Sequence, residues 1–145
     1  MDEKKSTGDL LDILEKKPLK ASLDEIRPEQ LTESLSEYLT WLIAERSLKP
    51  ADILERSGMK KPYFYELING TKTNPSRDKL IQLCFGLEFS LDETQTFLKR
   101  FGTAQLYPRN RRDSILIYCF HHKMTIIETD IRLMEFGENT FLNIE

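Results

Sequence analysis

The sequence predicts an all-α fold for this 145-residue chain. Apolar residues recur at helical spacing in most segments, and no segment sustains the alternation of a β-strand. Capping boxes, which open helices, are indicated by the spacing of Ser90 with Glu93 and of Thr125 with Glu128. Charged residues make up 31% of the chain, and only six Gly and six Pro occur, which is typical of a helix-rich soluble protein.

The first third of the chain predicts an acidic helical segment and then a longer helix. Residues 1–30 form the acidic segment, with a short amphipathic helix from Asp9 to Lys17 that Pro18 ends. Residues 1–45 carry six Lys/Arg against eleven Asp/Glu, a net charge of −5. A second helix is predicted from Thr32 to Arg46, because its apolar residues follow helical spacing: Leu35, Tyr38, Leu39, Leu42 and Ile43.

The segment from Pro50 to Gly70 predicts two short helices joined by a tight turn. Pro50 suits the first turn of a helix, because its missing N–H needs no partner there. Gly58 supplies the backbone freedom that a turn between two helices requires. A short helix, a glycine turn and a second helix with a basic start are the layout of a DNA-reading helix-turn-helix. Each helix has one apolar stripe, formed by Ile53 and Leu54 and by Phe64, Leu67 and Ile68.

The last half of the chain contains an internal repeat. Residues 76–106 and 111–141 align without gaps at an offset of 35, and nine of the 31 pairs are identical, where about two are expected by chance. Each copy predicts a helix, a short turn and a second helix that stops at Gly102 or Gly137. Ser114 to Phe120 has a strand-like composition, but its repeat partner is far more helical, so we expect a buried helix there. We infer a duplicated helical hairpin.

Charge is distributed unevenly along the chain. The net charge is −3, yet residues 46–79 carry eight Lys/Arg against four Asp/Glu, a net of +4. This positive segment coincides with the predicted helix-turn-helix, as attraction to DNA phosphates requires. An ordinary solvated basic face would have the same composition, so charge alone leaves both interpretations open.

Several classes of function are disfavoured by what the chain lacks. No run of 18 apolar residues exists and the N-terminus has no apolar signal core, so we expect no membrane span and a cytoplasmic location. Cys84 and Cys119 lie on apolar helix faces and are expected to be buried structural thiols. The pair His121-His122 lacks a neighbouring ligand set, so no metal is expected. No catalytic motif or phosphate-binding loop occurs, so we expect neither an enzyme nor a cofactor.

Three short motifs stand in and after the helix pair: Gly58-Met59, Asn69-Gly70 and Asn74-Pro75-Ser76. With these motifs, the stretch from Leu35 to Gly102 resembles the Cro/lambda-repressor-like helix-turn-helix family, often called XRE. The resemblance implies a lambda-repressor-like five-helix domain in residues 31–106. Residues 107–145 would then form a C-terminal helical hairpin, a repeat of 76–106 that packs on the helix-turn-helix domain.

The resemblance also implies a function and its residues. Such a protein is a bacterial or phage-type regulator that reads the major groove of double-stranded DNA, here with the helix 60–69. Lys61 would donate to guanine, and Tyr65 would touch a thymine methyl group or a phosphate. Carried over position by position, the candidate DNA contacts are Lys49, Lys60, Lys61, Pro62, Tyr65, Glu66, Asn69, Lys72 and Arg77.

A second basic cluster lies between the repeat copies and consists of Arg109, Arg111 and Arg112. It is a candidate phosphate clamp. However, Arg112 is the repeat partner of Arg77, so a structural role at a helix start is equally expected.

Two functions stay open. The first is a sequence-specific transcriptional regulator, expected to bind DNA as a homodimer. The alternative is a protein-interaction adaptor, antitoxin-like or kinase-partner-like, on a degenerate helix-turn-helix scaffold. The acidic total, Pro50 and Glu66 favour this alternative. Residues 107–145 and the acidic N-terminus are candidate partner surfaces, although the hairpin 107–145 is equally expected to do no more than cover the core of its sister copy.

Overall fold

A computed structural model describes residues 33–142 of the chain, and this part folds into α-helices without a β-strand. The predicted all-α class is therefore confirmed for these residues. The expected helix from Asp9 to Lys17 and the rest of the acidic segment 1–30 lie outside the described residues. In chain order the helices are α4 (Leu35–Glu45), α5 (Pro50–Ser57), α6 (Lys61–Asn69), α7 (Arg77–Gly86), α8 (Leu91–Arg100), α9 (Arg111–His121) and α10 (Ile126–Glu135).

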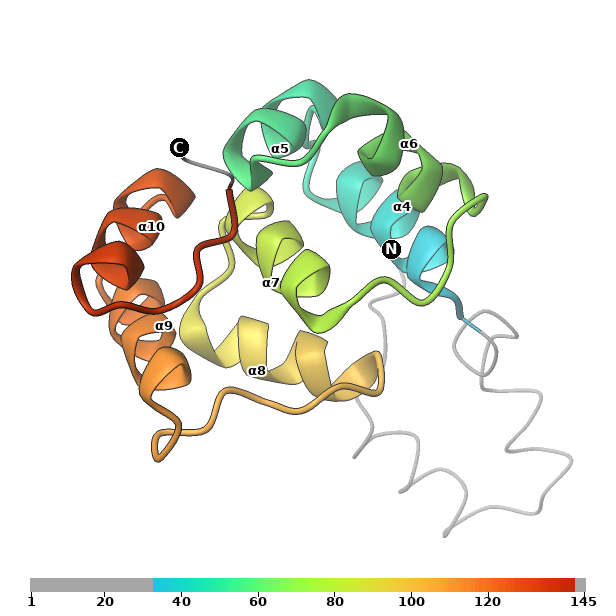
Figure 1. The fold of residues 1–145 in the computed structure, drawn as a ribbon. Coiled ribbons are helices and arrows are strands. Elements are labelled where there is room, and N and C mark those ends of the chain that lie inside the picture. Colours follow the sequence, from blue (N-terminus) through green and yellow to red (C-terminus); the bar gives the residue numbers. More distant parts are fainter. Residues whose placement is uncertain (1–32, 143–145) are drawn as a thin grey trace, which may run out of the picture.

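Helix α7 lies near the middle of the fold, with α4, α5 and α6 on one side and α9 and α10 on the other (Figure 1). α5 packs along α7, α4 packs against α6, and α8 contacts both α7 and α9. Buried side chains from both sides join one apolar cluster, which includes Phe64, Ile81, Phe97, Leu116 and Leu133. None of the helices in residues 33–142 combines the length and apolar character that a bilayer crossing needs.

The helix starts fall into two groups. Five of the described helices have a side-chain cap, in which a side-chain oxygen accepts from a backbone N–H of the first turn. The capping residues are Ser34, Ser76, Ser90, Asn110 and Thr125. The two predicted capping boxes, at Ser90 and Thr125, are both confirmed. The starts of α5 and α6 have no side-chain cap, and a lysine precedes each of them, Lys49 or Lys60.

Residues 35 positions apart make corresponding contacts across the repeat. Arg77 forms a two-pronged ion pair with Asp113, with N–O distances of 3.0 and 2.8 Å. Arg112 forms the reciprocal pair with Asp78, at 2.8 and 3.1 Å. Each copy therefore supplies an arginine to the aspartate of the other, which ties the start of α7 to the start of α9.

The two chain segments that follow α8 and α10 are also held alike. Gln95 of α8 accepts from the backbone N–H of Leu106 at 2.7 Å. Its repeat partner, Asp130 of α10, accepts from the N–H groups of Phe141 and Leu142 at 2.7 and 2.9 Å. These bonds fold each segment back over its own hairpin. The second segment brings Leu142 against Gly58, in the turn between α5 and α6.

Gly86 allows α5 and α7 to pack closely, and its replacement tests that contact. A Cβ atom at this position would lie 2.7 Å from the Ile53 carbonyl oxygen and 3.0 Å from Ser57 Cβ. We expect Gly86→Ala to lower the free energy of unfolding by about 1–3 kcal/mol, measured by urea denaturation.

The sign of the change in the free energy of unfolding shows whether close packing or helix propensity dominates at Gly86. Alanine favours a helix over glycine by about 1 kcal/mol, so an uncrowded site would be stabilised by Gly86→Ala. If crowding dominates, Gly86→Val must cost more than Gly86→Ala because valine adds two further methyl groups. A stabilising Gly86→Ala variant would contradict the close approach.

Candidate nucleic-acid interface

The turn between α5 and α6 is built from local hydrogen bonds and one glycine. Gly58 follows α5 with a φ of 69°, a left-handed conformation that favours glycine. The buried Ser57 hydroxyl donates to the Leu54 carbonyl at 2.8 Å and accepts from the Met59 N–H at 3.2 Å. These bonds satisfy polar groups in the turn and hold the start of α6 in a defined direction.

One side of α6 packs against the core and α4, and the other side faces solvent. Phe64 and Leu67 are buried, and Ser36 of α4 donates a hydrogen bond to the Ile68 carbonyl. Of the sequence-predicted DNA contacts on this helix, Tyr65 and Glu66 are half-buried. Four others are exposed at the two ends of the helix, namely Lys60, Lys61, Pro62 and Asn69.

The start of α6 differs by one residue from the sequence expectation, and its end at Asn69 agrees with it. The helix begins at Lys61, so Lys60 is its cap residue and not its first helical residue. At the other end, Asn69 Oδ1 accepts from the Thr71 N–H at 2.8 Å. The carbonyl side of this amide is thereby occupied, and its –NH₂ side remains as a hydrogen-bond donor.

The starts of α5 and α6 have backbone N–H groups without a side-chain partner, and lysines lie beside them. The first turn of any helix has backbone N–H groups without intrahelical partners, and the helix dipole is positive at this end. Neither helix caps these groups with a side chain, although Pro50 and Pro62 each remove one N–H from the first turn. Lys60 and Lys61, both exposed, add two positive charges at the start of α6, whereas at the start of α5 the charge of Lys49 is offset by Asp52 in the first turn. This arrangement attracts anions, phosphate oxygens in particular.

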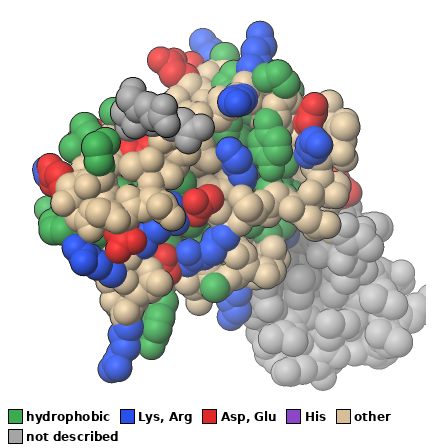
Figure 2. Space-filling model, in the orientation of Figure 1, with side chains coloured by type: hydrophobic (Ala, Val, Ile, Leu, Met, Phe, Trp, Pro, Cys, Tyr) green, Lys and Arg blue, Asp and Glu red, His purple; other side chains and the backbone are tan. Residues whose placement is uncertain are grey.

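A lysine of α7 joins the same region, which reasoning from sequence had not singled out. The ammonium of Lys79 lies 5.4 Å from the centre of the Tyr63 ring, a cation–π distance. Burial, and then the charge of Glu66, raise the pKa of Tyr63, so its hydroxyl is a neutral donor at physiological pH. The only feature of the sequence that indicated Lys79 as a candidate was its place in the positive segment 46–79. Figure 2 shows Lys and Arg side chains over α6 and the adjoining part of α7, with acidic groups interspersed.

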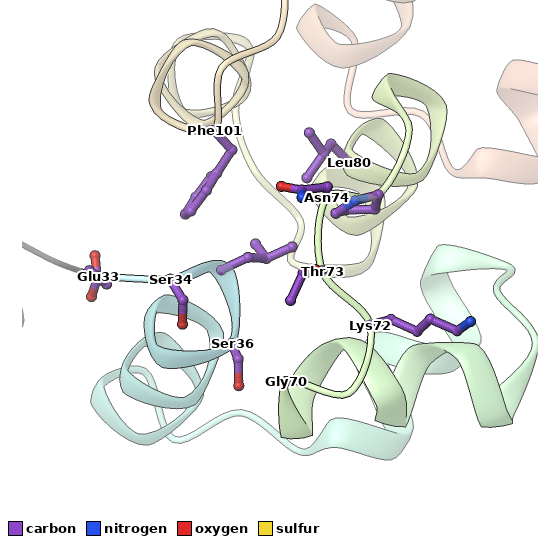
Figure 3. Close-up of a pocket in the computed structure, with 11 residues that line it drawn as sticks. Glu33, Ser34, Ser36, Gly70, Lys72, Thr73, Asn74, Leu80 and Phe101 are labelled. Atoms are coloured by element: carbon purple, nitrogen blue, oxygen red, sulfur yellow. The ribbon is translucent and has the colours of Figure 1, made fainter.

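Lys72 is exposed on the loop that follows α6. The backbone N–H of Lys72 donates to the Glu66 carbonyl at 3.0 Å, which holds the loop against the helix. The loop borders a cavity of about 370 Å³ between the start of α4, Leu80 of α7 and Phe101 after α8. Figure 3 shows the Lys72 side chain directed away from this cavity, while the Phe101 ring points toward it. The lysine therefore extends toward solvent.

Arg77 and the second basic cluster are placed differently from the lysines. Arg77 donates to Asp113 and to the carbonyls of Ala104 and Gln105, so its guanidinium is engaged within the chain. Arg112 is engaged in the same way by Asp78 and the Asn139 carbonyl. Within the cluster, Arg111 lies 3.8 Å from Glu138, and Arg109 is exposed. The ion pairs supply the structural role that the sequence left open for Arg112.

The remaining reactive side chains of the described residues are not gathered into a metal site, and both cysteines are buried. No group of three or more His, Cys, Asp or Glu side chains within them is arranged to hold a metal ion. Burial raises the pKa of both Cys84 and Cys119, so these thiols stay protonated and weakly nucleophilic. The chemistry of the α5–α6 region is thus that of anion attraction and hydrogen-bond donation.

Comparisons with protein-family models, with curated proteins and with solved structures find no match to this chain.

Proposed function

We propose that this protein is a sequence-specific DNA-binding regulator and that residues 31–106 form a lambda-repressor-like helix-turn-helix domain. In this proposal α5 braces the DNA backbone and α6 enters the major groove. Lys61 and Tyr65 contact base edges, with Pro62 and Glu66 beside them, while Lys49, Lys60, Lys72 and Asn69 contact phosphates. Arg77 and Arg112 are excluded from the proposed surface, because their guanidinium groups are held by Asp113 and Asp78.

The proposal depends mainly on how α5 and α6 begin: neither has a side-chain cap, and a lysine precedes each. Among the described helices, only α5 and α6 begin without a side-chain cap. An uncapped start costs stability unless water or a ligand satisfies the N–H groups. Both starts also carry exposed lysines at the cap position, where a cation opposes the helix dipole. An anionic ligand such as a DNA phosphate would satisfy the N–H groups and neutralise the lysines together.

Binding of duplex DNA is the direct test of this proposal. Duplexes are selected from a random pool at low salt, and the affinity of the best duplex is then followed by fluorescence anisotropy as salt is raised. We expect log K to fall linearly with log salt. Lys61→Glu is expected to weaken binding about tenfold to hundredfold, the loss typical of a base contact. Lys60→Gln is expected to reduce the salt slope by about 1, the effect of one lost phosphate contact.

The matched control is Lys99→Glu, which makes the same charge change at an exposed position of α8. It should alter binding far less than Lys61→Glu, because only long-range charge is affected. Failure to bind any duplex at low salt would refute the regulator. So would equal losses from Lys61→Glu and Lys99→Glu.

The alternative function is a protein-interaction adaptor on the same helices. Glu66 places a negative charge in the middle of the proposed reading helix, which is unfavourable beside phosphates unless it accepts from a cytosine amine. Large hydrophobic side chains are exposed on the far hairpin, including Ile127 and Ile131 of α10. Such exposed side chains are typical of protein contacts. Absence of DNA binding would favour this alternative.

A further inference from the structure

The outer face of α10 is apolar and open. Ile127, Ile131 and Met134 are spaced by four and three residues, so they project from one side of the helix. Their exposed fractions are 59%, 47% and 51%. Figure 2 shows hydrophobic side chains over α10 at the left edge of the molecule. Isolated exposed hydrophobic residues are common on proteins, but a stripe along one helix indicates a contact surface.

The repeat shows that this face is not required by the fold. The residues of α8 at the corresponding positions are Asp92, Thr96 and Lys99, and all three are exposed. Both helices begin with a capping box and are followed by a positive-φ glycine two residues after their last helical residue. The same helix is therefore built with a polar outer face in one copy and an apolar outer face in the other. The apolar stripe of α10 must have a reason other than helix formation or internal packing.

The stripe matches itself under a two-fold rotation. In a two-fold contact, residue i of one copy meets residue j of the other and the reverse also holds. Ile131 lies near the middle of the stripe, so two antiparallel α10 helices would bring Ile131 against Ile131 and Ile127 against Met134. In the same register Arg132 approaches Glu128 of the second copy, and both residues are exposed. A charged rim of mixed sign around an apolar centre is typical of protein interfaces.

The exposed area also fits a dimer. The three side chains of the stripe, Ile127, Ile131 and Met134, are each about half exposed. Taking roughly 200 Å² for a large side chain, they expose about 300 Å². A standard interface buries about 800 Å² per partner, of which about 65% is apolar in homodimers. The stripe can therefore supply the apolar centre of such an interface, and neighbouring side chains would have to supply the rest of its area.

We propose that α10 is a self-association surface, on which a second copy of this chain docks antiparallel across Ile127, Ile131 and Met134. The charges argue against the acidic N-terminal segment as the occupant. Residues 1–32 have six Lys/Arg and eight Asp/Glu, a net charge of −2, and Glu128 and Glu135 outnumber Arg132 beside the stripe. This inference goes beyond DNA binding and holds whether or not the chain binds DNA.

The test transplants the surface of α8 onto α10. The triple variant Ile127→Asp, Ile131→Thr, Met134→Lys places on α10 the residues that α8 carries at the same positions. Sedimentation velocity of the full chain without DNA, from low-micromolar to sub-millimolar concentration, should show a dimer for the wild type and a monomer for the triple variant. A single Ile131→Asp change should weaken the dimer at least about tenfold, while Thr96→Asp on α8 should leave it unchanged.

A charge reversal keeps the test decisive if the triple variant fails to fold. Arg132→Glu should weaken the dimer, because it sets like charges against Glu128 of the second copy, and it leaves the capping box of α10 in place. A wild-type chain that stays monomeric throughout the concentration range would overturn the proposal. A dimer that survives the α10 variants, or that is lost only when residues 1–32 are deleted, would overturn it as well.

Discussion

Replacing Phe120 by alanine is expected to lower the free energy of unfolding by about 3–5 kcal/mol, the usual loss for a buried phenylalanine. Phe120 of α9 is only 4% exposed. Its ring stacks on that of Phe85, its repeat partner in α7, with ring centres 4.3 Å apart and an angle of 22° between the planes. The removal of either ring leaves a cavity at the junction of the two repeat copies. We therefore expect Phe85→Ala to cost a similar amount.

The two rings are expected to be coupled. A double-mutant cycle over Phe85→Ala and Phe120→Ala should return about 0.5–1.5 kcal/mol of interaction, as stacked aromatic pairs do. The matched control is Phe136→Ala, the same change at a residue that is 51% exposed. It should alter stability by no more than about 0.5 kcal/mol.

Two spectroscopic probes make the Phe120 experiment informative about the whole fold. Trp41, the single tryptophan, lies on α4, on the far side of α7 from α9. Its fluorescence reports on the side of the fold formed by α4, α5 and α6, whereas far-ultraviolet circular dichroism reports on all helices. If the hairpin 107–145 belongs to one core, Phe120→Ala shifts both urea transitions together. A shift of the dichroism transition alone would show that the hairpin unfolds by itself.

Much of the helical framework could be predicted because its signals are local. Capping boxes at Ser90 and Thr125 and stops at Gly102 and Gly137 depend on residues within one turn of each other, and all four are observed. The start of α6 is one residue later than expected, since Lys60 has an extended conformation with a ψ of 137°. Helix ends often shift by a residue, because local sequence constrains them weakly.

The contacts between distant parts of the chain could not be predicted from the sequence. The repeat placed Arg77 and Arg112 at equivalent positions, but it could not show that each reaches the aspartate of the other copy. The Lys79 ammonium lies over the Tyr63 ring only because the fold brings these two side chains of α7 and α6 together. The three apolar residues of α10 have the spacing of a core stripe, and only the packing of α9 and α10 shows that this side faces solvent. Each of these three features depends on contacts between residues that are far apart in the sequence.

Removal of Asp113 is the second change expected to have a large effect. Its carboxylate is 8% exposed and accepts from Arg77 and from the Tyr107 N–H at 3.0 Å. Asp113→Ala leaves both donors without this partner at a site where water has little access. We expect a loss of about 2–3 kcal/mol, measured by urea denaturation.

The repeat supplies the matched control for Asp113→Ala. Asp78 plays the same part for Arg112, but its side chain is 45% exposed. In Asp78→Ala, water can take the place of the lost carboxylate, so the loss should be at most about 1 kcal/mol. Equal losses at the two positions would contradict the view that burial sets the strength of these pairs.

The pH dependence isolates the charge of Asp113. Burial by itself would raise the pKa of this carboxyl, but the hydrogen bonds from Arg77 and Tyr107 and the charges of Arg77 and Arg112 outweigh it, so the pKa lies below its ordinary value of 3.8. A lowered pKa in the folded state stabilises the protein above the ordinary value and ceases to do so as pH falls through the folded value. The stability difference between wild type and Asp113→Asn should therefore be constant near neutral pH and shrink below about pH 4. A difference that stays constant down to strongly acidic pH would show that hydrogen-bond geometry, and not charge, holds Arg77 in place.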